Sequence, residues 1–79
     1  MPLTIFLALN VKSGKEKHVQ EALKKLEEVI VVCTVSAGPY DVVALVQVNT
    51  LEDYKTFFID RVGTLPHITD YTSFIAMDQ

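Results

Sequence analysis

The feature of this sequence that most constrains its fold is a surplus of apolar strand surface over the helices available to cover it. Four segments show the apolar alternation or the β-branched content of strands, whereas two show the apolar stripe of a surface helix. The expected strands are Leu3–Val11, Val29–Ala37, Tyr40–Val48 and Ile68–Met77. The expected helices run from Ser13 to about Glu28 and from Thr50 to Arg61 or Val62. Two helices can cover one face of a four-stranded sheet, so we expect the other face to stay open.

The order of these segments predicts an α+β fold of the ferredoxin-like β-α-β-β-α-β type, with a four-stranded antiparallel sheet and both helices on one face. Gly38 and Pro39 separate the two middle strands, which predicts an antiparallel hairpin with a tight turn. Each helix start carries an N-cap residue, Ser13 or Thr50, three residues before an acidic residue.

The uncovered face of the sheet is expected to be apolar and to pair with the same face of a second copy in a homodimer. Its large side chains are expected to be Phe6, Ile30, Val32, Val43 and Leu45. Burying each of them is worth about 1.5–3 kcal/mol, and together they would form a larger exposed patch than monomers usually tolerate. The alternative is a different strand register that leaves this face only half apolar. A soluble monomer at micromolar concentration would support that alternative.

The length of 79 residues allows one domain, residues 1–79, with a thin core of its own. Small domains usually add a disulfide, a metal or oligomerisation. Cys33 is the sole cysteine, so no disulfide forms within the chain, and we interpret it as a small core residue. Cys33, His18 and His67 lack the spacing of a metal site, so we expect no metal. Oligomerisation is the route that remains.

Charge and hydropathy exclude two classes of partner. The net charge of −3 argues against direct contact with nucleic acid. No apolar run approaches the roughly 18 residues of a membrane span. The start, Met1–Thr4, lacks the basic region of a signal peptide, so we expect a cytoplasmic location.

The segment between the two middle strands carries the most distinctive chemistry. Gly38 can adopt a positive φ, and Pro39 stiffens the turn. Asp41 stands at the start of an apolar strand, and Tyr40 adds a ring with a hydroxyl. An aspartate beside free turn N–H groups can bind the ammonium and carboxylate of a small ligand. The competing interpretation is that Asp41 bonds its own local backbone.

The run VSAGPYDVVALV, residues 35–46, resembles the hairpin of the Lrp/AsnC effector domain, also called the RAM domain. Leu65-Pro66-His67-Ile68 resembles the segment before the last strand of that domain, and residues 68–75 resemble that strand itself. The resemblance spans the whole chain. It is closest to the stand-alone form of the domain, because no helix-turn-helix segment precedes it.

The resemblance implies a homodimer that assembles further into an octamer or decamer and binds a free amino acid between dimers. It implies ligand contacts from Gly38, Tyr40, Asp41, Tyr71 and Ser73. Tyr71 and Ser73 stand where the family has two threonines, so Tyr71 is a bulky departure, and His67 stands where the family usually has glycine. A full-length Lrp/AsnC regulator is a possible co-assembly partner.

Two other functions share this strand order. Cofactor-free monooxygenases of the dimeric ferredoxin-like type would need an acting residue such as Tyr71 or His67, and nothing in the sequence pairs these two. An ACT-like sensor would use a glycine after the first strand, where this chain has Gly14. The sequence shows no catalytic arrangement and no phosphate-binding loop, so we expect a non-enzyme without a cofactor.

Overall fold

The sheet and its two helices follow the predicted order in a computed structural model, which describes residues 2–76. The strands are β1 (Leu3–Val11), β2 (Val29–Thr34), β3 (Val42–Val48) and β4 (Ile68–Ala76). The helices are α1 (Glu16–Lys24) and α2 (Leu51–Phe57), and α2 continues as a π-helical turn over Phe58–Val62. All three strand pairs are antiparallel, in the order β2-β3-β1-β4. The ferredoxin-like fold is therefore confirmed; Met77 of the expected last strand lies outside the described residues.

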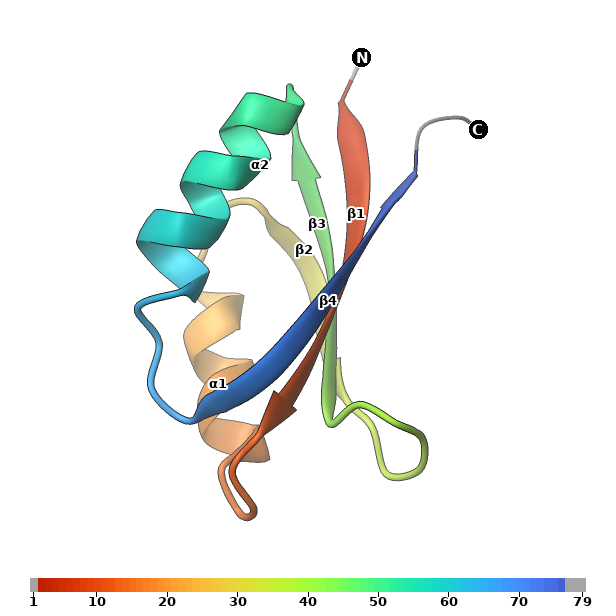
Figure 1. The fold of residues 1–79 in the computed structure, drawn as a ribbon, viewed down its shortest axis with the longest axis vertical. Coiled ribbons are helices and arrows are strands. Elements are labelled where there is room, and N and C mark those ends of the chain that lie inside the picture. Colours follow the sequence, from red (N-terminus) through yellow and green to blue (C-terminus); the bar gives the residue numbers. More distant parts are fainter. Residues whose placement is uncertain (1, 77–79) are drawn as a thin grey trace.

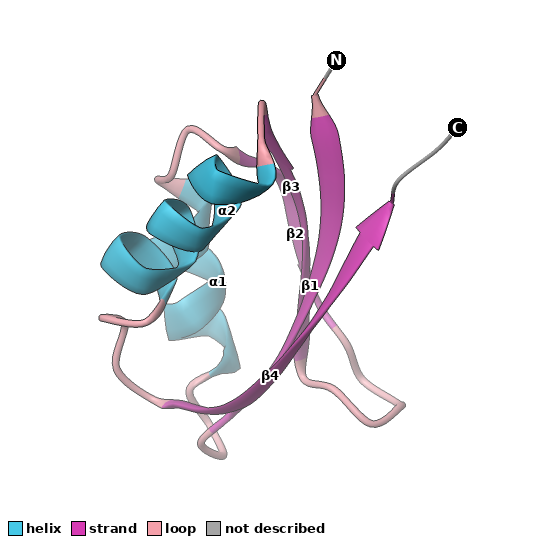
Figure 2. Ribbon diagram, turned by 45° about the horizontal axis from the view of Figure 1, so that its top comes forward, coloured by secondary structure: helices cyan, strands magenta, loops and turns pink. Residues whose placement is uncertain are grey.

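Both helices lie on the same side of the sheet, and the opposite side has no covering element among the described residues (Figures 1 and 2). The core lies between the helices and the sheet because alternate residues of β1 and β3 face the helices. Ile5, Leu7 and Leu9 of the central strand β1 are fully buried. Val19 and Leu23 of α1, with Tyr54 and Phe57 of α2, close over them. The predicted apolar stripes of both helices therefore form the core.

The two predicted N-caps have different outcomes. Thr50 caps α2 as expected, because its Oγ1 accepts a hydrogen bond from the Asp53 backbone N–H at 3.1 Å. The capping box at Ser13 is wrong: α1 begins at Glu16, and its N-cap residue, Lys15, makes no side-chain capping bond. Gly14 adopts a left-handed φ of +84°, so a turn separates Ser13 from the helix.

Helix α1 also ends at Lys24, earlier than the predicted end near Glu28. The backbone N–H of Leu26 donates to the Leu23 carbonyl, which closes the last turn tightly. An extension would place Glu27 and Glu28 at the negative end of the helix dipole, which is unfavourable. Because α1 ends at Lys24, Glu28 lies outside the helix and pairs with Arg61 of the turn that continues α2.

The hairpin between β2 and β3 has a longer connection than the predicted tight turn. The strands end at Thr34 and begin again at Val42, so residues 35–41 form a loop. The Val35 N–H donates to the Asp41 carbonyl at 2.8 Å and closes this loop.

The uncovered side of the sheet, here called the open face, is apolar as predicted. Phe6 lies between Leu45 of β3 and Phe74 of β4, and Ala8 lies between Val43 and Thr72. Val31 and Cys33 of β2 lie opposite Leu45 and Val43 on the same face. Phe6, Val31 and Phe74 keep 46%, 50% and 55% of their surface exposed. Cys33 is exposed on this face, so its interpretation as a core residue is wrong.

The prediction that Val32 lies on the open face is wrong. Val32 lies opposite Ala44, faces the helices and is buried in the core. Ile30 is the extra residue of a β-bulge between Val29 and Val31, at the edge of the sheet. Residues 29–32 are all β-branched and aliphatic, so no polar side chain marks the outward face of this strand. Ile75 of β4 lies opposite Ile5, on the helix side of the sheet.

Candidate functional site

Asp41 fastens the β2–β3 loop to the end of the central strand. Its Oδ2 accepts a hydrogen bond from the Val11 N–H at 3.0 Å, and its own N–H donates to the Leu9 carbonyl at 2.9 Å. The carboxylate therefore continues the hydrogen bonding of β1 beyond its last pair with β3, at the end where β3 begins. One carboxylate oxygen thus has a structural role at the base of the loop.

Tyr40 links the same loop to the far strand across the open face. Its hydroxyl shares a hydrogen bond of 2.8 Å with Thr72 Oγ1. Because β1 lies between β3 and β4, the Tyr40 side chain must pass over β1 to reach Thr72. Ala8 stands on the open face opposite Thr72 but is only 4% exposed, which agrees with a ring lying over it. Gly38, at the tip of the loop, adopts a φ of +128°, which favours glycine.

Tyr71 and Ser73 lie on the other side of the sheet from Tyr40. Ser73 Oγ is 2.6 Å from the Tyr54 hydroxyl of α2, and the Tyr71 ring packs 4.4 Å from the Phe58 ring, centroid to centroid. Burial raises the pKa of the Tyr54 phenol above its ordinary value, and the hydrogen bond to Ser73 opposes that shift. Within one chain, therefore, the five predicted ligand residues form two groups on opposite sides of the sheet.

A hollow of 240 Å³ adjoins Tyr71 at the exposed edge of β4. Its lining comes from the π-helical turn, the following loop and the first residues of β4: Phe58, Val62, Gly63, Leu65, Ile68, Thr69, Asp70 and Tyr71. The Asp70 carboxylate accepts a hydrogen bond from the Tyr71 N–H at 2.8 Å. Tyr71 thus forms one wall of this hollow, and its bulky side chain does not fill the hollow.

His67 has a left-handed backbone with φ of +77°, a conformation that favours glycine. This agrees with the glycine that the Lrp/AsnC effector domain usually has at this position. The His67 carbonyl accepts a hydrogen bond from the Lys12 N–H, and its ring packs edge-to-face on His18 at 5.2 Å. Partial desolvation lowers the pKa of His67, and the charges of Lys15, His18 and Lys12 lower it further.

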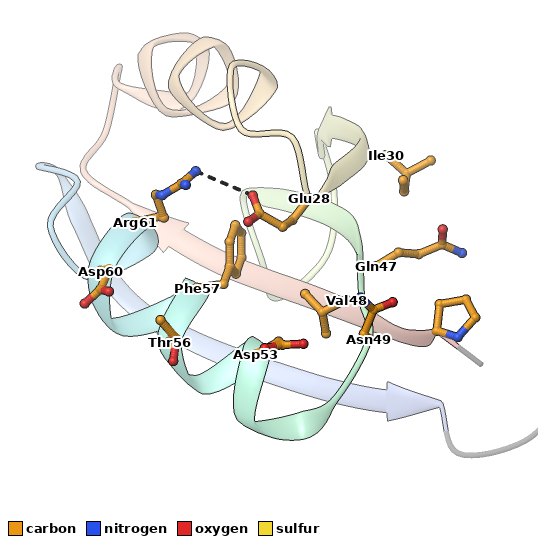
Figure 3. A pocket seen from close by; sticks show the side chains of 11 residues that line it. Glu28, Ile30, Gln47, Val48, Asn49, Asp53, Thr56, Phe57, Asp60 and Arg61 are labelled. Carbon is orange, nitrogen blue, oxygen red and sulfur yellow. Dashed lines mark ion pairs between the residues drawn. The ribbon is translucent and has the colours of Figure 1, made fainter.

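A second cavity is one that the sequence analysis missed. It has a volume of 560 Å³ and lies between α2 and the edge of the sheet where β2 begins and β3 ends (Figure 3). Its lining residues are Pro2, Glu28, Ile30, Gln47, Val48, Asn49, Asp53, Thr56, Phe57, Asp60 and Arg61. The helical spacing of the last five is a signal that sequence reasoning could have used. The facing residues come from three separate segments, which only the fold brings together.

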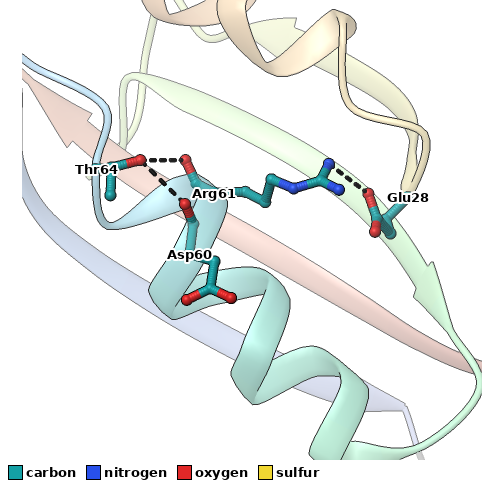
Figure 4. A network of polar contacts seen from close by, with 4 residues as sticks. All are labelled: Glu28, Asp60, Arg61 and Thr64. Carbon is teal, nitrogen blue, oxygen red and sulfur yellow. Dashed lines mark hydrogen bonds and ion pairs between the residues drawn. The ribbon is translucent and has the colours of Figure 1, made fainter.

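An ion pair crosses one end of this cavity. Arg61 Nη1 lies 3.5 Å from Glu28 Oε1 (Figure 4). The Thr64 hydroxyl lies 3.2 Å from the carbonyl oxygens of both Asp60 and Arg61, so it can donate to either and closes the π-helical turn that carries Arg61. Glu28 Oε1 is buried and has no hydrogen-bond partner among residues 2–76.

Residues 2–76 contain no group of three or more His, Cys, Asp or Glu side chains placed to hold a metal ion. None of the helices in this range is long and apolar enough to cross a membrane.

The element order and the antiparallel sheet define a ferredoxin-like domain, and comparisons with known proteins give its family. The family model described as the Lrp/AsnC ligand binding domain matches residues 4–79. The chain therefore belongs to the Lrp/AsnC ligand-binding domain family, as the resemblance indicated. No functionally curated protein matches the sequence.

Solved structures agree with this family. FFRP-DM1 is 31% identical with a TM-score of 0.89, and the match covers 95% of this chain and 99% of that one. Hypothetical protein PHS023 from Pyrococcus horikoshii is 30% identical with a TM-score of 0.89, covering 98% and 92%. Transcriptional regulator NMB0573 from Neisseria meningitidis, solved as a complex with L-Met, is 15% identical with a TM-score of 0.84. That match covers 98% of this chain and 51% of the regulator, and at this identity it shows the fold alone.

Proposed function

We propose that residues 1–79 form one cytoplasmic and non-catalytic regulatory domain that forms homo-oligomers and responds to a free amino acid. The observation that carries the proposal is the hairpin loop. Asp41 and Tyr40 hold this loop at the rim of an uncovered apolar sheet face, in a chain whose family is one of ligand-binding domains. The monooxygenase and ACT-like alternatives are not favoured, because the family model covers nearly the whole chain.

The first part of the proposal is a dimer through the open face. Phe6, Val31 and Phe74 are each about half exposed. Phe6 lies beside Phe74, and Leu45 lies between Phe6 and Val31 in the same row across the sheet. In this proposal the interface would use Phe6, Val43 and Leu45, with Val31 in place of Val32 and Ile30 at its edge. A second copy of the same face would bury these side chains, and the interface would be symmetric.

The second part is a ligand site that forms between dimers, in an octamer or decamer. Gly38, Tyr40 and Asp41 of one subunit would meet Tyr71 and Ser73 of another, because a single chain holds these two groups on opposite sides of its sheet. The L-Met bound by the Neisseria meningitidis regulator supports an amino acid as the class of ligand. In this chain the Ser73 hydroxyl is already hydrogen-bonded to the Tyr54 hydroxyl. The charged contact to the ligand would therefore come from Asp41 in the hairpin loop.

The mechanism would be linkage between ligand binding and assembly. A ligand that contacts two dimers stabilises the assembly that completes its site, by an amount set by the ligand concentration relative to its dissociation constant. The same surfaces would allow co-assembly with a full-length Lrp/AsnC regulator. The net charge of −3 leaves contact with DNA to that partner.

Calorimetry against the twenty amino acids, combined with sedimentation of the same samples, tests the proposal. We expect heat for one or a few amino acids and a larger assembly in their presence. Tyr40→Phe should lower the affinity without unfolding the chain, because it removes one hydroxyl and keeps the ring. Glu21→Gln, on the exposed side of α1, is the matched control. No heat and no change in assembly with any amino acid would refute the proposal.

A further inference from the structure

The 560 Å³ cavity beside α2, here called the α2 cavity, has the size of a small-molecule site and lies apart from the hairpin loop. Two backbone irregularities flank it. The wall formed by α2 ends in the π-helical turn Phe58–Val62, and the facing wall contains the β-bulge at Ile30. Both kinds of irregularity are frequent at functional sites because they redirect side chains. Here Asp60, Arg61 and Ile30, which line the cavity, belong to these irregular segments.

The charges that line the α2 cavity are predominantly negative. Glu28, Asp53 and Asp60 oppose the single cation Arg61, which leaves an excess of two negative charges. Arg61 is paired with Glu28, and neither Asp53 nor Asp60 has an ion-pair partner among the described residues. Glu28 Oε1 has this ion pair but no hydrogen bond among the described residues, and the Glu28 side chain is 28% exposed, so the excess of negative charge rests on Asp53 and Asp60. An additional cation would therefore be stabilised in this cavity.

The rest of the lining indicates what kind of cation fits. Phe57 and Val48 supply apolar surface between the charged groups (Figure 3). Ile30 adds apolar surface farther along the cavity, and Gln47 and Asn49 supply neutral amides. The acidic side chains are spread along α2 and the opposite wall and do not cluster as metal ligands would among residues 2–76. A ligand with a positive end group on a short aliphatic stem matches this arrangement better than a bare metal ion.

We propose that the α2 cavity binds a small organic cation, a primary ammonium or guanidinium carried on an aliphatic stem. The site uses Asp53 and Asp60 as the charged contacts and Phe57 as the apolar floor. Arg61 competes with the ligand for the negative charge of Glu28. This site is independent of the amino-acid response proposed for the hairpin loop.

An NMR titration of the intact chain with 1,4-diaminobutane and with agmatine tests this site. We expect saturable shifts of amide resonances at residues 47–49 and 53–61, and none with sodium chloride at the same ionic strength. Asp53→Asn and Asp60→Asn should each weaken binding about tenfold, as expected for loss of one charged contact. Glu52→Gln is the matched control, because it also removes an exposed carboxylate from α2 but lies outside the cavity.

Arg61→Gln gives the opposite expectation, since it removes the competing cation and should tighten binding of both amines. Weaker binding in this variant would overturn the proposal, because it would mean that Arg61 contacts the ligand itself. Absence of saturable shifts up to about 10 mM ligand, a dissociation constant too weak for a specific site, would also overturn it. So would equal binding by Asp53→Asn, Asp60→Asn and Glu52→Gln.

Discussion

Leu45→Asp should separate the assembly of this protein from its folding. Leu45 lies on the open face between Phe6 and Val31 and is only partly buried within one chain. An aspartate can therefore keep contact with water in the monomer, so the monomer should stay folded. In a face-to-face dimer, both copies would bury this carboxylate in an apolar interface without a partner.

The magnitude follows from the symmetry of the interface. Burying an unpaired charge costs several kcal/mol, and a two-fold interface repeats the change in both subunits. Even about 2–3 kcal/mol per copy adds to roughly 4–6 kcal/mol, which raises the dimer dissociation constant about 10³- to 10⁴-fold.

Sedimentation velocity over a concentration series, with thermal unfolding of the same samples, measures both quantities. Thr34→Asp is the control, because Thr34 is exposed on the helix side of β2 rather than on the open face. We expect Leu45→Asp to sediment as a folded monomer and Thr34→Asp to sediment like the unmodified chain. An unchanged dimer in Leu45→Asp, or equal dissociation in Thr34→Asp, would refute the open-face interface.

Three further predictions concern the stability of the fold. Thr50→Ala should lower the free energy of unfolding by about 1 kcal/mol through loss of the α2 N-cap, measured by urea denaturation. Val32→Ala should destabilise the chain more than Val31→Ala when both are measured under monomeric conditions, because Val32 lies in the core; the reverse order would contradict the observed face of β2. His67→Gly should raise the melting temperature, because glycine adopts the left-handed backbone without strain. Folding lowers the pKa of His67 below its ordinary value of 6.5, so protonation of this residue favours the unfolded chain. The free energy of unfolding should therefore decrease as the pH falls below 6.5, and His67→Gly should remove this pH dependence.

The type and order of the elements could be predicted from local periodicity. The alternation of Leu3–Val11 and the helical spacing of Tyr54, Phe57 and Val62 each depend on a few neighbouring residues. These patterns were sufficient for the ferredoxin-like order and for an uncovered apolar face. The Thr50 cap was predictable for the same reason, because its hydrogen bond joins residues three apart.

The ligand residues could be named but not placed. The hairpin motif indicated Gly38, Tyr40 and Asp41, yet the bonds that hold them connect Tyr40 to Thr72 and Asp41 to Val11, across 32 and 30 residues. No pattern within the hairpin specifies such partners. The same limit applies to the α2 cavity, whose walls come from α2, the end of β3 and the start of β2.

By itself, the sequence determined that this chain forms a sheet with more apolar surface than its own helices can cover, because side-chain alternation along a strand is a local property. Only the tertiary structure decided which residues occupy each face. In β2 every candidate was β-branched and aliphatic, so the bulge at Ile30 and the pairing with β3 directed Val31 outward and Val32 into the core. The physical reason is that a one-residue change in pairing reverses the faces of a strand, and pairing is settled by contacts between distant segments.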